Sequence, residues 1–435
     1  VKNGLAAAQN SGKQIVLLTQ TYASPSTTRL VGDFKGSYAN VRHISYDAIA
    51  QDAALNAFEA KYGERALADY DFSKAEVIVS FGADILGDWQ GGGFDSGYSK
   101  GRVPQNGKMS RHIQFEANMS LSGANADKRI PLKPSEQKVA LAKLYAKLNN
   151  TTVGGSLSDA ATKAVDAAAA QIRKAGAAAV VVTGLDDENA QAVVLAINEQ
   201  IKSAAFDVAA PKYTRQGNVK EVNALVADMK AGKVGVLLMD GVNPAYSLPN
   251  AADFLEGLQA VGLSVSFSTN TNETTVATQY TAASSYFLES WGDVQMKKGH
   301  YGLMQPAIKE LFDTRQFQSS LLLWMGKDKT YYDYIKETWT TSILGESEWN
   351  KALHDGVFAT SASVLSDLDM AVNAMVAPVS EGAVDETTVV PLASALRELS
   401  NATVADMELS LYSKVGMGDG QMANNPWLQE FPDPI

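Results

Sequence analysis

The sequence predicts an α/β fold with mostly parallel, doubly wound sheets in two Rossmann-like domains. Short runs of β-branched and aliphatic residues alternate with amphipathic, alanine-rich stretches of helical length, a pattern typical of βαβ units. The chain has 435 residues, which is more than one hydrophobic core normally holds. Hydrophobic residues make up 46% of the chain and charged residues 20%, as in ordinary globular proteins.

Three aliphatic runs in the first half predict strands, namely Gln14–Thr19, Ala75–Asp84 and Ala177–Gly184. Two alanine-rich stretches predict helices, namely Asp47–Gly63 and Asp159–Gly176. Another helix follows the third strand, and Asp186 or Asp187 is expected to cap it. A carboxylate at this position accepts hydrogen bonds from the free amides of the first helical turn.

The second half repeats the alternation, with predicted strands at Lys233–Gly241, Leu263–Thr269 and Ser284–Glu289 and a helix from Pro249. The segment Ala204–Asn218 is loop-like and separates the two series. It therefore predicts one domain at residues 1–205 and a second at 206–435. From about Asp328 the second domain is expected to be helical, followed by a strand at Met407–Val415 and an extended, proline-containing connector at 424–435.

Charge and composition exclude several classes of function. The net charge of −11 argues against a nucleic-acid partner, because phosphate binding needs clustered lysine and arginine. The absence of cysteine excludes thiolate zinc sites and cysteine-held iron–sulfur clusters in this chain. The histidines are far apart in the sequence, so we expect no metal site; they are His43, His112, His300 and His354.

No apolar run reaches the roughly 18 residues that a membrane-spanning helix needs. We therefore expect other subunits to hold the protein at any membrane where it works. The chain begins at Val1 and stops at "FPDPI", and we expect both ends to be internal to a longer polypeptide.

Several predicted strands end in short polar loops, where α/β sheets bind ligands. Asn243 and Thr274 lie in two of these loops and are suited to hydrogen bonding. The same residues also suit turns and helix caps, so both roles stay open. Glu289 and Asp293 flank Trp291 and could act as a general acid–base pair, although a structural role is favoured because the sequence indicates no cleft. No residue is nominated as catalytic.

Several segments, in order, resemble molybdopterin oxidoreductases. "GKVGVLLMDGVNPAYSLPN" resembles their strand and GxNP-like loop, with Asn243 and Pro244 at the matching positions. In "LSVSFSTNTNETTVATQYTAASSYFLESWGD" the matching residues are Glu273 and Thr274 for an "ET" pair and Glu289 and Gly292 for an "E…G" pair. "DFSKAEVIVSFGADIL" and "NADKRIPLKPSE" resemble two further segments upstream. The series covers about residues 12 to 318.

The departures from that family concern its cofactor. A "PGTD" turn of the family reads "PSEQ" here, at Pro134–Gln137, and "ADyvLP" reads "ASSYFLE". The chain also has no cysteine that could serve as a molybdenum ligand. The candidate residues of the pterin loop are therefore expected to be vestigial, with no cofactor and no metal bound; they are Asn243, Pro244, Glu273, Thr274, Glu289 and Gly292.

A narrower resemblance is to the large iron–sulfur subunit of alternative complex III, the bacterial quinol:cytochrome c oxidoreductase. It is carried by "YDFSKAEVIVSFGADILGDW", "SGANADKRIPLKPSE" and "NNPWLQEFPDPI". The resemblance implies that this chain is the half without molybdenum cofactor of a fused subunit, and that iron–sulfur clusters lie in the other half. It also implies a place on the periplasmic side of the inner membrane, beside a multihaem cytochrome c subunit and a membrane quinol-binding subunit.

The expected function is accordingly that of a non-catalytic structural domain in a respiratory electron-transfer complex. Two alternatives stay open. One is an active molybdopterin-dependent oxidoreductase fragment with an oxygen ligand to the metal. The other is a small-molecule-binding α/β domain without a redox role.

Overall fold

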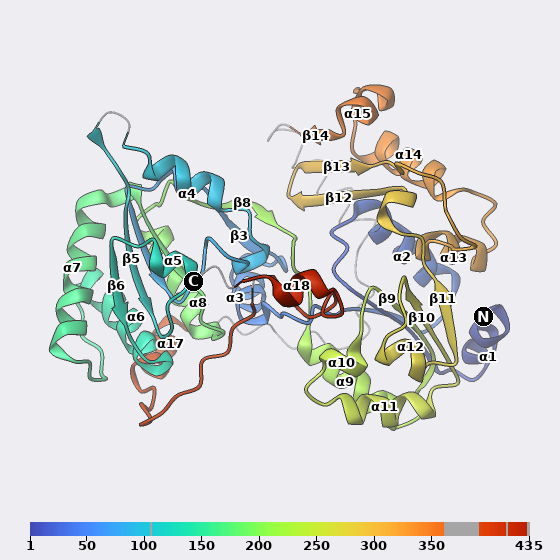
Figure 1. Ribbon diagram of the computed structural model, residues 1–435, viewed down its shortest axis with the longest axis horizontal. Coiled ribbons are helices and arrows are strands. Elements are labelled where there is room, and N and C mark those ends of the chain that lie inside the picture. The colour runs from blue at the N-terminus through green and yellow to red at the C-terminus, as the bar shows by residue number, and fades with distance from the viewer. Residues whose placement is uncertain (105–106, 361–390, 415, 433–435) are drawn as a thin grey trace. The chain divides into compact units, whose positions relative to one another are not determined.

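A computed structural model describes residues 1–104, 107–360, 391–414 and 416–432. The chain divides into two compact units, each assembled from two separate segments (Figure 1). The first unit combines Val1–Ala50 with the stretch that begins at Tyr213. The second combines Gln51–Lys212 with the described residues from 391 onward.

This division differs from the expected consecutive domains at 1–205 and 206–435. The later boundary falls at Lys212 and Tyr213, close to the expected one. The first 50 residues, however, belong with the second half, because their two strands pair in the sheet of that unit.

The first unit is built on a parallel sheet with the strand order β11-β10-β9-β1-β2. Its strands are β1 (Gln14–Thr19), β2 (Val41–Ser45), β9 (Val234–Asp240), β10 (Leu263–Ser268) and β11 (Tyr280–Ala283). In register, Leu17 of β1 lies opposite His43 of β2 and Leu238 of β9. The apolar residues of β1 and β9 are buried on both faces, which explains why these strands are continuous aliphatic runs.

Alternate residues of β1 enter two different cores. Ile15 and Leu17 pack with helices α1, α2, α13, α14 and α15, whereas Val16 and Leu18 pack with α9 and α11. The helices of this unit are α1 (Lys2–Asn10), α2 (Pro25–Ser37), α9 (Val219–Lys230), α10 (Pro244–Ser247), α11 (Ala251–Ala260), α12 (Glu273–Ala277), α13 (Phe317–Trp324), α14 (Tyr331–Ser342) and α15 (Trp349–Asp355). An antiparallel ribbon completes the unit, with β12 (Gly292–Lys297), β13 (His300–Met304) and β14 (Val357–Ala359).

The second unit has a parallel sheet with the order β6-β5-β4-β7. Its strands are β4 (Val77–Phe81), β5 (Arg111–Glu116), β6 (Lys128–Pro131) and β7 (Ala179–Thr183), and β3 (Leu67–Tyr70) pairs antiparallel with β8 (Phe206–Lys212). Its α-helices are α3 (Asp52–Tyr62), α4 (Asp95–Arg102), α5 (Leu121–Ala124), α6 (Pro134–Leu148), α7 (Asp159–Ala175), α8 (Glu188–Gln200), α17 (Leu392–Ser400) and α18 (Pro426–Glu430). One face of the parallel sheet forms an apolar core with α6, α7, α8 and α17. The mixed α/β architecture with mostly parallel sheets confirms the predicted fold class.

Most predicted elements are present. The strand Gln14–Thr19 and the helix that starts at Asp159 begin where they were predicted. Asp187 caps α8 by accepting hydrogen bonds from the amides of Asn189 and Ala190, at 2.9 and 3.1 Å.

Three predicted elements differ. Ser284–Glu289 is not a strand; Tyr280–Ala283 forms the edge strand β11 instead, because it is this segment that pairs with β10. The loop predicted at Ala204–Asn218 contains strand β8, which finds its partner in β3. Met407–Val415 was predicted as a strand, but its described residues, 407–414, have no strand partner.

The connector predicted at 424–435 is not extended throughout, because Pro426–Glu430 form a short helix. Proline is favoured at the first helical position, where its missing N–H is not needed, and the Asn425 side chain accepts a hydrogen bond from the amide of Trp427 at 3.0 Å. Trp427 is 82% exposed, so it does not pack on the described part of this domain. Residues 433–435 lie outside the described part. No helix in the described ranges combines the length and apolarity that crossing a bilayer requires.

Candidate functional site

The strand order of the first unit determines where a ligand site would lie. Strand β1 has β2 on one side and β9 on the other, and the helices that cover these two pairs, α2 and α9, pack into opposite cores. Sheets of this order bind ligands at the carboxyl ends of the two strands where the order reverses. Here these ends are Thr19 of β1 and Asp240 of β9, and we call this edge the switch edge.

A tyrosine–carboxylate pair occupies the switch edge. The hydroxyl of Tyr22 donates a short hydrogen bond to Oδ2 of Asp240. Burial raises the pKa of Asp240 to about 6, against the opposing effect of that hydrogen bond. Burial, followed by the charge of Asp240, also raises the pKa of Tyr22 well above its ordinary value. The pair is therefore a neutral phenol beside a carboxylate that is mostly ionised at neutral pH.

The backbone beyond the pair is closely packed. The amide of Gln20 donates to the carbonyl of Asp240 at 3.1 Å. Gly241 has a φ of +67°, and a Cβ there would lie 2.6 Å from the Gln20 side chain. This position therefore requires glycine, both for its backbone conformation and for space.

Asp47 closes the neighbouring part of the same edge. Its carboxylate accepts hydrogen bonds from the amide and hydroxyl of Thr21, at 3.2 and 2.7 Å. It also accepts from the amides of Gln216 and Gly217, at 3.0 and 2.9 Å. One carboxylate thus fastens the loop after β1 to the loop that precedes α9.

Four of the predicted loop residues lie together further along this edge. The amide of Asn243 donates to Oε2 of Glu273 at 2.8 Å, and its Oδ1 accepts from the hydroxyl and the backbone N–H of Thr274 at 2.7 and 3.2 Å. Thr274 in turn accepts from the amide of Ala245 at 3.1 Å. Pro244 begins helix α10. The Asn243 side chain therefore does not cap its own helix but joins the start of α10 to the start of α12.

Glu289 and Gly292 belong to a different part of the unit. Glu289 accepts hydrogen bonds from the amides of Tyr286 and Leu311, at 3.0 and 3.2 Å. Gly292 begins the ribbon strand β12. The structure thus brings four of the six vestigial-loop candidates together and places these two in contacts of their own.

Asp293 is buried, and its carboxylate is held by hydrogen bonds from other side chains. Its carboxylate accepts hydrogen bonds from the hydroxyls of Ser24 and Ser26, both at 2.5 Å, and from the indole of Trp339 at 2.8 Å. Burial raises its pKa, while these donors oppose the shift. The hydrogen bonds of Asp293 join α2, β12 and α14. This favours a structural role for Asp293 over acid–base chemistry with Glu289.

The corresponding edge of the second unit is filled by the chain itself. Its strand order reverses between β4 and β7. A Cβ at Gly184, just after β7, would lie 2.3 Å from the carbonyl oxygen of Gly82, just after β4. The indole of Trp89 donates to the carbonyl of Thr183 at 3.1 Å. Backbone and indole therefore contact each other where a ligand would enter.

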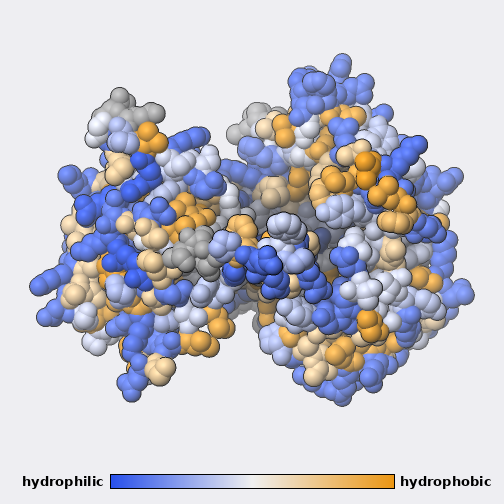
Figure 2. All heavy atoms as spheres, in the orientation of Figure 1, coloured by the Kyte–Doolittle hydropathy of each residue, from blue (hydrophilic) through white to orange (hydrophobic). Residues whose placement is uncertain are grey.

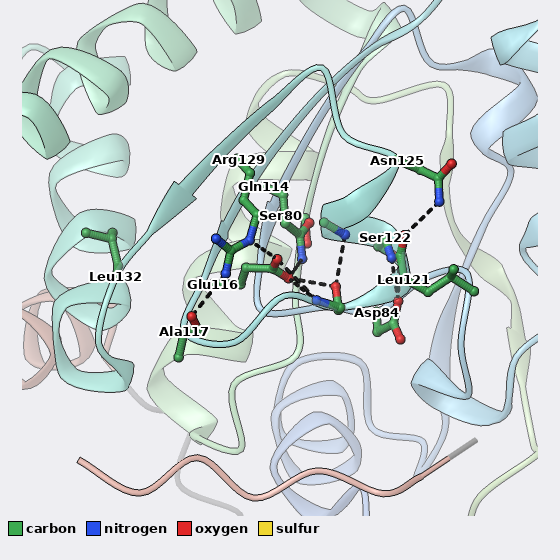
Figure 3. A network of polar contacts seen from close by, with 12 residues as sticks. Ser80, Asp84, Gln114, Glu116, Ala117, Leu121, Ser122, Asn125, Arg129 and Leu132 are labelled. Atoms are coloured by element: carbon green, nitrogen blue, oxygen red, sulfur yellow. Dashed lines mark hydrogen bonds and ion pairs between the residues drawn. The ribbon is translucent and has the colours of Figure 1, made fainter. Parts of the chain in front are cut away.

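A buried polar network lies beside it on β5 (Figure 3). Glu116 accepts from Nε of Arg129 at 2.5 Å, from the hydroxyl of Ser120 at 2.6 Å and from Gln114 at 3.1 Å. Oε1 of Gln114 lies 3.0 Å from Nε2 of His112. Burial, as the largest cause, lowers the pKa of His112 to about 4, so its ring is neutral at pH 7. Every one of these groups has a partner within the unit.

The sequence did not nominate the Tyr22–Asp240 pair, Asp47 or this network. The alternation of His112, Gln114 and Glu116 in "RHIQFE" is a signal for the network, because alternate residues share one face of a strand. No comparable local signal marks Tyr22 and Asp240.

The switch edge as a whole is acidic. Asp240 follows the core of β9, Asp47 follows β2 and Glu273 follows β10, and parallel strands place these ends at one edge. The amide of Asn243 and the backbone N–H of Glu273 itself lower the pKa of Glu273, which keeps it charged at neutral pH. Carboxylates repel phosphate and pyrophosphate, whose sites are normally formed by amide N–H groups and basic residues. Among the residues that the structure describes, no cluster of three or more histidine, aspartate or glutamate side chains could hold a metal ion.

Comparisons with known proteins support the fold. No protein-family model matches the chain, and no curated protein matches it in sequence. Among solved structures, acetylene hydratase from Pelobacter acetylenicus superposes with a TM-score of 0.60 at 13% identity, over 83% of this chain and 62% of that one. A formyltransferase/hydrolase complex from Methylorubrum extorquens aligns with a TM-score of 0.43 at 13% identity, over 77% of this chain and 96% of that one.

At this level of identity the similarity shows the fold alone. It supports a molybdopterin-oxidoreductase-like fold, as the series of motifs predicted. The chain spans less than two thirds of the length of acetylene hydratase.

Proposed function

We propose that this chain is a cofactor-free, non-catalytic structural domain of a respiratory electron-transfer complex. Within the molybdopterin-oxidoreductase-like fold, the narrower motif matches favour the large subunit of alternative complex III, the bacterial quinol:cytochrome c oxidoreductase. In this role the domain scaffolds an iron–sulfur half and a multihaem cytochrome c subunit on the periplasmic side of the inner membrane. A membrane quinol-binding subunit, rather than this chain, provides the attachment to the bilayer.

The observation that carries the proposal is how the polar groups of the switch edge are used. Asn243 and Thr274 bond to each other, and Asn243 also bonds to Glu273. A loop that holds a ligand aims such donors outward, toward the place where the ligand binds. Here a ligand that used them would first have to break these contacts, at about 0.5–1.5 kcal/mol for each hydrogen bond.

Charge supports the same conclusion. A pterin dinucleotide carries a pyrophosphate, and the switch edge presents Asp47 after β2, Asp240 at the end of β9 and Glu273 after β10. At 4 to 8 Å and an effective dielectric of about 20, each carboxylate–phosphate pair repels by roughly 2–4 kcal/mol. The GxNP-like and "ET" motifs then have a structural role, because the Asn243–Thr274 contact holds together the loops that follow β9 and β10.

Substitution of Thr274 tests the proposal. Thr274→Val keeps the shape of the side chain but removes the hydroxyl that bonds to Asn243 and Ala245. We expect the purified assembly to keep its quinol:cytochrome c turnover, with only the thermal stability of the chain reduced. The exposed Thr340→Val in α14 is a matched control for the loss of a hydroxyl. A collapse of turnover in Thr274→Val at unchanged stability and subunit content would contradict a purely structural loop.

A further inference from the structure

The chain after α17 carries an unusual concentration of exposed apolar side chains. Most of the face seen in Figure 2 is hydrophilic, with apolar residues in separate groups. The segment that follows α17, residues 401–432, is drawn as the orange-red trace that leads to α18 in Figure 1. We call its described residues the arm. Its exposed large hydrophobic residues are Val404, Met407, Leu409, Leu411, Tyr412, Met422, Trp427 and Phe431.

Within the arm, residues 407–413 have the sequence pattern of a strand. Met407, Leu409 and Leu411 alternate with Glu408 and Ser410, and the three apolar side chains are 91%, 81% and 85% exposed. Alternation with a period of two places such residues on one face of an extended chain. An amphipathic helix at a membrane surface would instead need a period of 3.6.

The backbone of this stretch is unpaired. No strand in the described part of the chain pairs with residues 407–413, and their amides have no backbone acceptor among the described residues. An isolated strand gains neither hydrogen bonds nor cover for its apolar face. The pattern and the unpaired backbone together indicate a strand-like stretch without a partner strand among the described residues.

The beginning of the stretch is held in place by the second unit. The carboxylate of Glu408 accepts hydrogen bonds from the hydroxyl and the amide of Ser135, at 2.5 and 2.9 Å. Nζ of Lys133 donates to the carbonyls of Ala405 and Asp406, at 2.6 and 3.0 Å. Both partners lie at the start of α6, so the arm leaves the domain from a defined point. Anchoring reduces the conformational entropy that is lost when the stretch binds.

We propose that residues 407–413 add as a β-strand to the open sheet edge of a partner protein. The unpaired amides and carbonyls would provide the main-chain hydrogen bonds, and Met407, Leu409 and Leu411 would cover an apolar face of the partner's sheet. This inference deepens the proposed function and rests on it, since a scaffold domain needs a surface for its neighbours.

Charge favours a particular kind of sheet edge. Around the stretch, the arm carries Asp406, Asp419 and Glu430 against a single base, Lys414. Open sheet edges commonly carry lysine, which discourages pairing with unrelated strands. An acidic arm complements such an edge, whereas a second copy of this chain, with a net charge of −11, would be repelled. The partner is therefore a protein whose open edge carries basic residues.

Hydrogen exchange of the arm amides tests the proposal. Exchange would be followed by mass spectrometry in the isolated chain and in the assembly purified through a tag on this chain. We expect the amides of residues 408–412 to exchange at least 100-fold more slowly in the assembly. Cross-links from Lys414 should then reach a strand at the edge of a partner's sheet.

Two variants separate backbone pairing from side-chain burial. Leu411→Pro removes an amide from the strand, and Leu411→Ala removes only the side chain. We expect Leu411→Pro to abolish the protection and to reduce partner retention at least tenfold, and Leu411→Ala to reduce retention less. Phe312→Ala removes an apolar side chain of similar exposure outside the arm and should leave retention unchanged.

Several results would overturn the proposal. These are equal exchange in the isolated chain and the assembly, protection that arises in a homodimer of this chain, or protection by phosphatidylglycerol–phosphatidylcholine vesicles without protein. Each leaves the proposed structural role of the switch edge intact. Conversely, a turnover that depends on Thr274 would remove that role while leaving the protection of the arm unaffected.

Discussion

Replacing Asp240 by asparagine should stabilise the first unit at neutral and alkaline pH. Burial raises the pKa of Asp240 from 3.8 to about 6. The shift is about 2 units, and at 1.36 kcal/mol per unit it corresponds to roughly 3 kcal/mol of destabilisation when the carboxylate is charged. Asp240 keeps some exposure to solvent, so we expect about 1–3 kcal/mol. Asparagine retains an oxygen that can accept the Tyr22 hydroxyl.

The sign of the pH dependence follows from the raised pKa. The folded state binds the Asp240 proton more tightly than the unfolded state, so the native protein loses stability as the pH rises from about 4 to about 6. Asp240→Asn lacks this loss. Its advantage over the native protein should be full at pH 8 and smaller at pH 5.

Urea unfolding at pH 5, 6.5 and 8, followed by tryptophan fluorescence, measures this difference. Asp186→Asn, at an exposed loop position, is the matched control for the loss of a carboxylate. If Asp240→Asn destabilises the protein, or shifts its stability by the same amount at every pH, the carboxylate is not held in the unfavourable environment described above.

Three further predictions concern other contacts. Asn243→Ala leaves the buried hydroxyl of Thr274 without its acceptor and should cost about 1–3 kcal/mol in urea unfolding, whereas a cost below about 0.5 kcal/mol would show that the loop contact is not structural. Burial lowers the pKa of His112 to about 4, so the second unit should lose up to roughly 3 kcal/mol of stability as the pH falls from 6.5 through 4. An acid titration of His112→Gln should show a smaller loss of stability than the native protein. An equal loss would contradict the assignment of this effect to His112. Arg129→Met leaves the buried carboxylate of Glu116 without its ion-pair partner and should destabilise the chain by about 3–5 kcal/mol, while Arg129→Met combined with Glu116→Gln should recover most of this loss in the same assay.

The sequence predicted those elements whose stability is set by local pattern. The aliphatic run Gln14–Thr19 is a strand because both faces of it are buried, and such a run has few alternatives. At the edge of the same sheet, Tyr280–Ala283 and Ser284–Glu289 have similar strand propensity. Pairing with β10, which the sequence does not reveal, selects the first of them. Pro211 in Phe206–Lys212 likewise concealed β8, because proline is compatible with a strand only where its missing N–H is not needed.

The candidate site was predictable to a similar extent. Asn243 and Thr274 could be nominated because each follows a recognisable strand, and the structure joins them. Tyr22 and Asp240 could not, since they are 218 residues apart and meet only because β1 and β9 are neighbours in the sheet. The short helix at Pro426 differs from the predicted extended connector for another reason: proline disrupts the interior of a helix but is favoured at its first position.

The molybdenum and pterin content of the purified chain tests the central claim most directly. Molybdenum would be measured by elemental analysis, and pterin by the fluorescence of its oxidised form after acid extraction, on chain isolated from its native cells. A structural domain with the switch edge closed by its own side chains predicts both at well below one tenth of an equivalent per chain. One equivalent of each, lost on substitution of Asn243 or Thr274, would contradict the account and show that this edge still binds a cofactor.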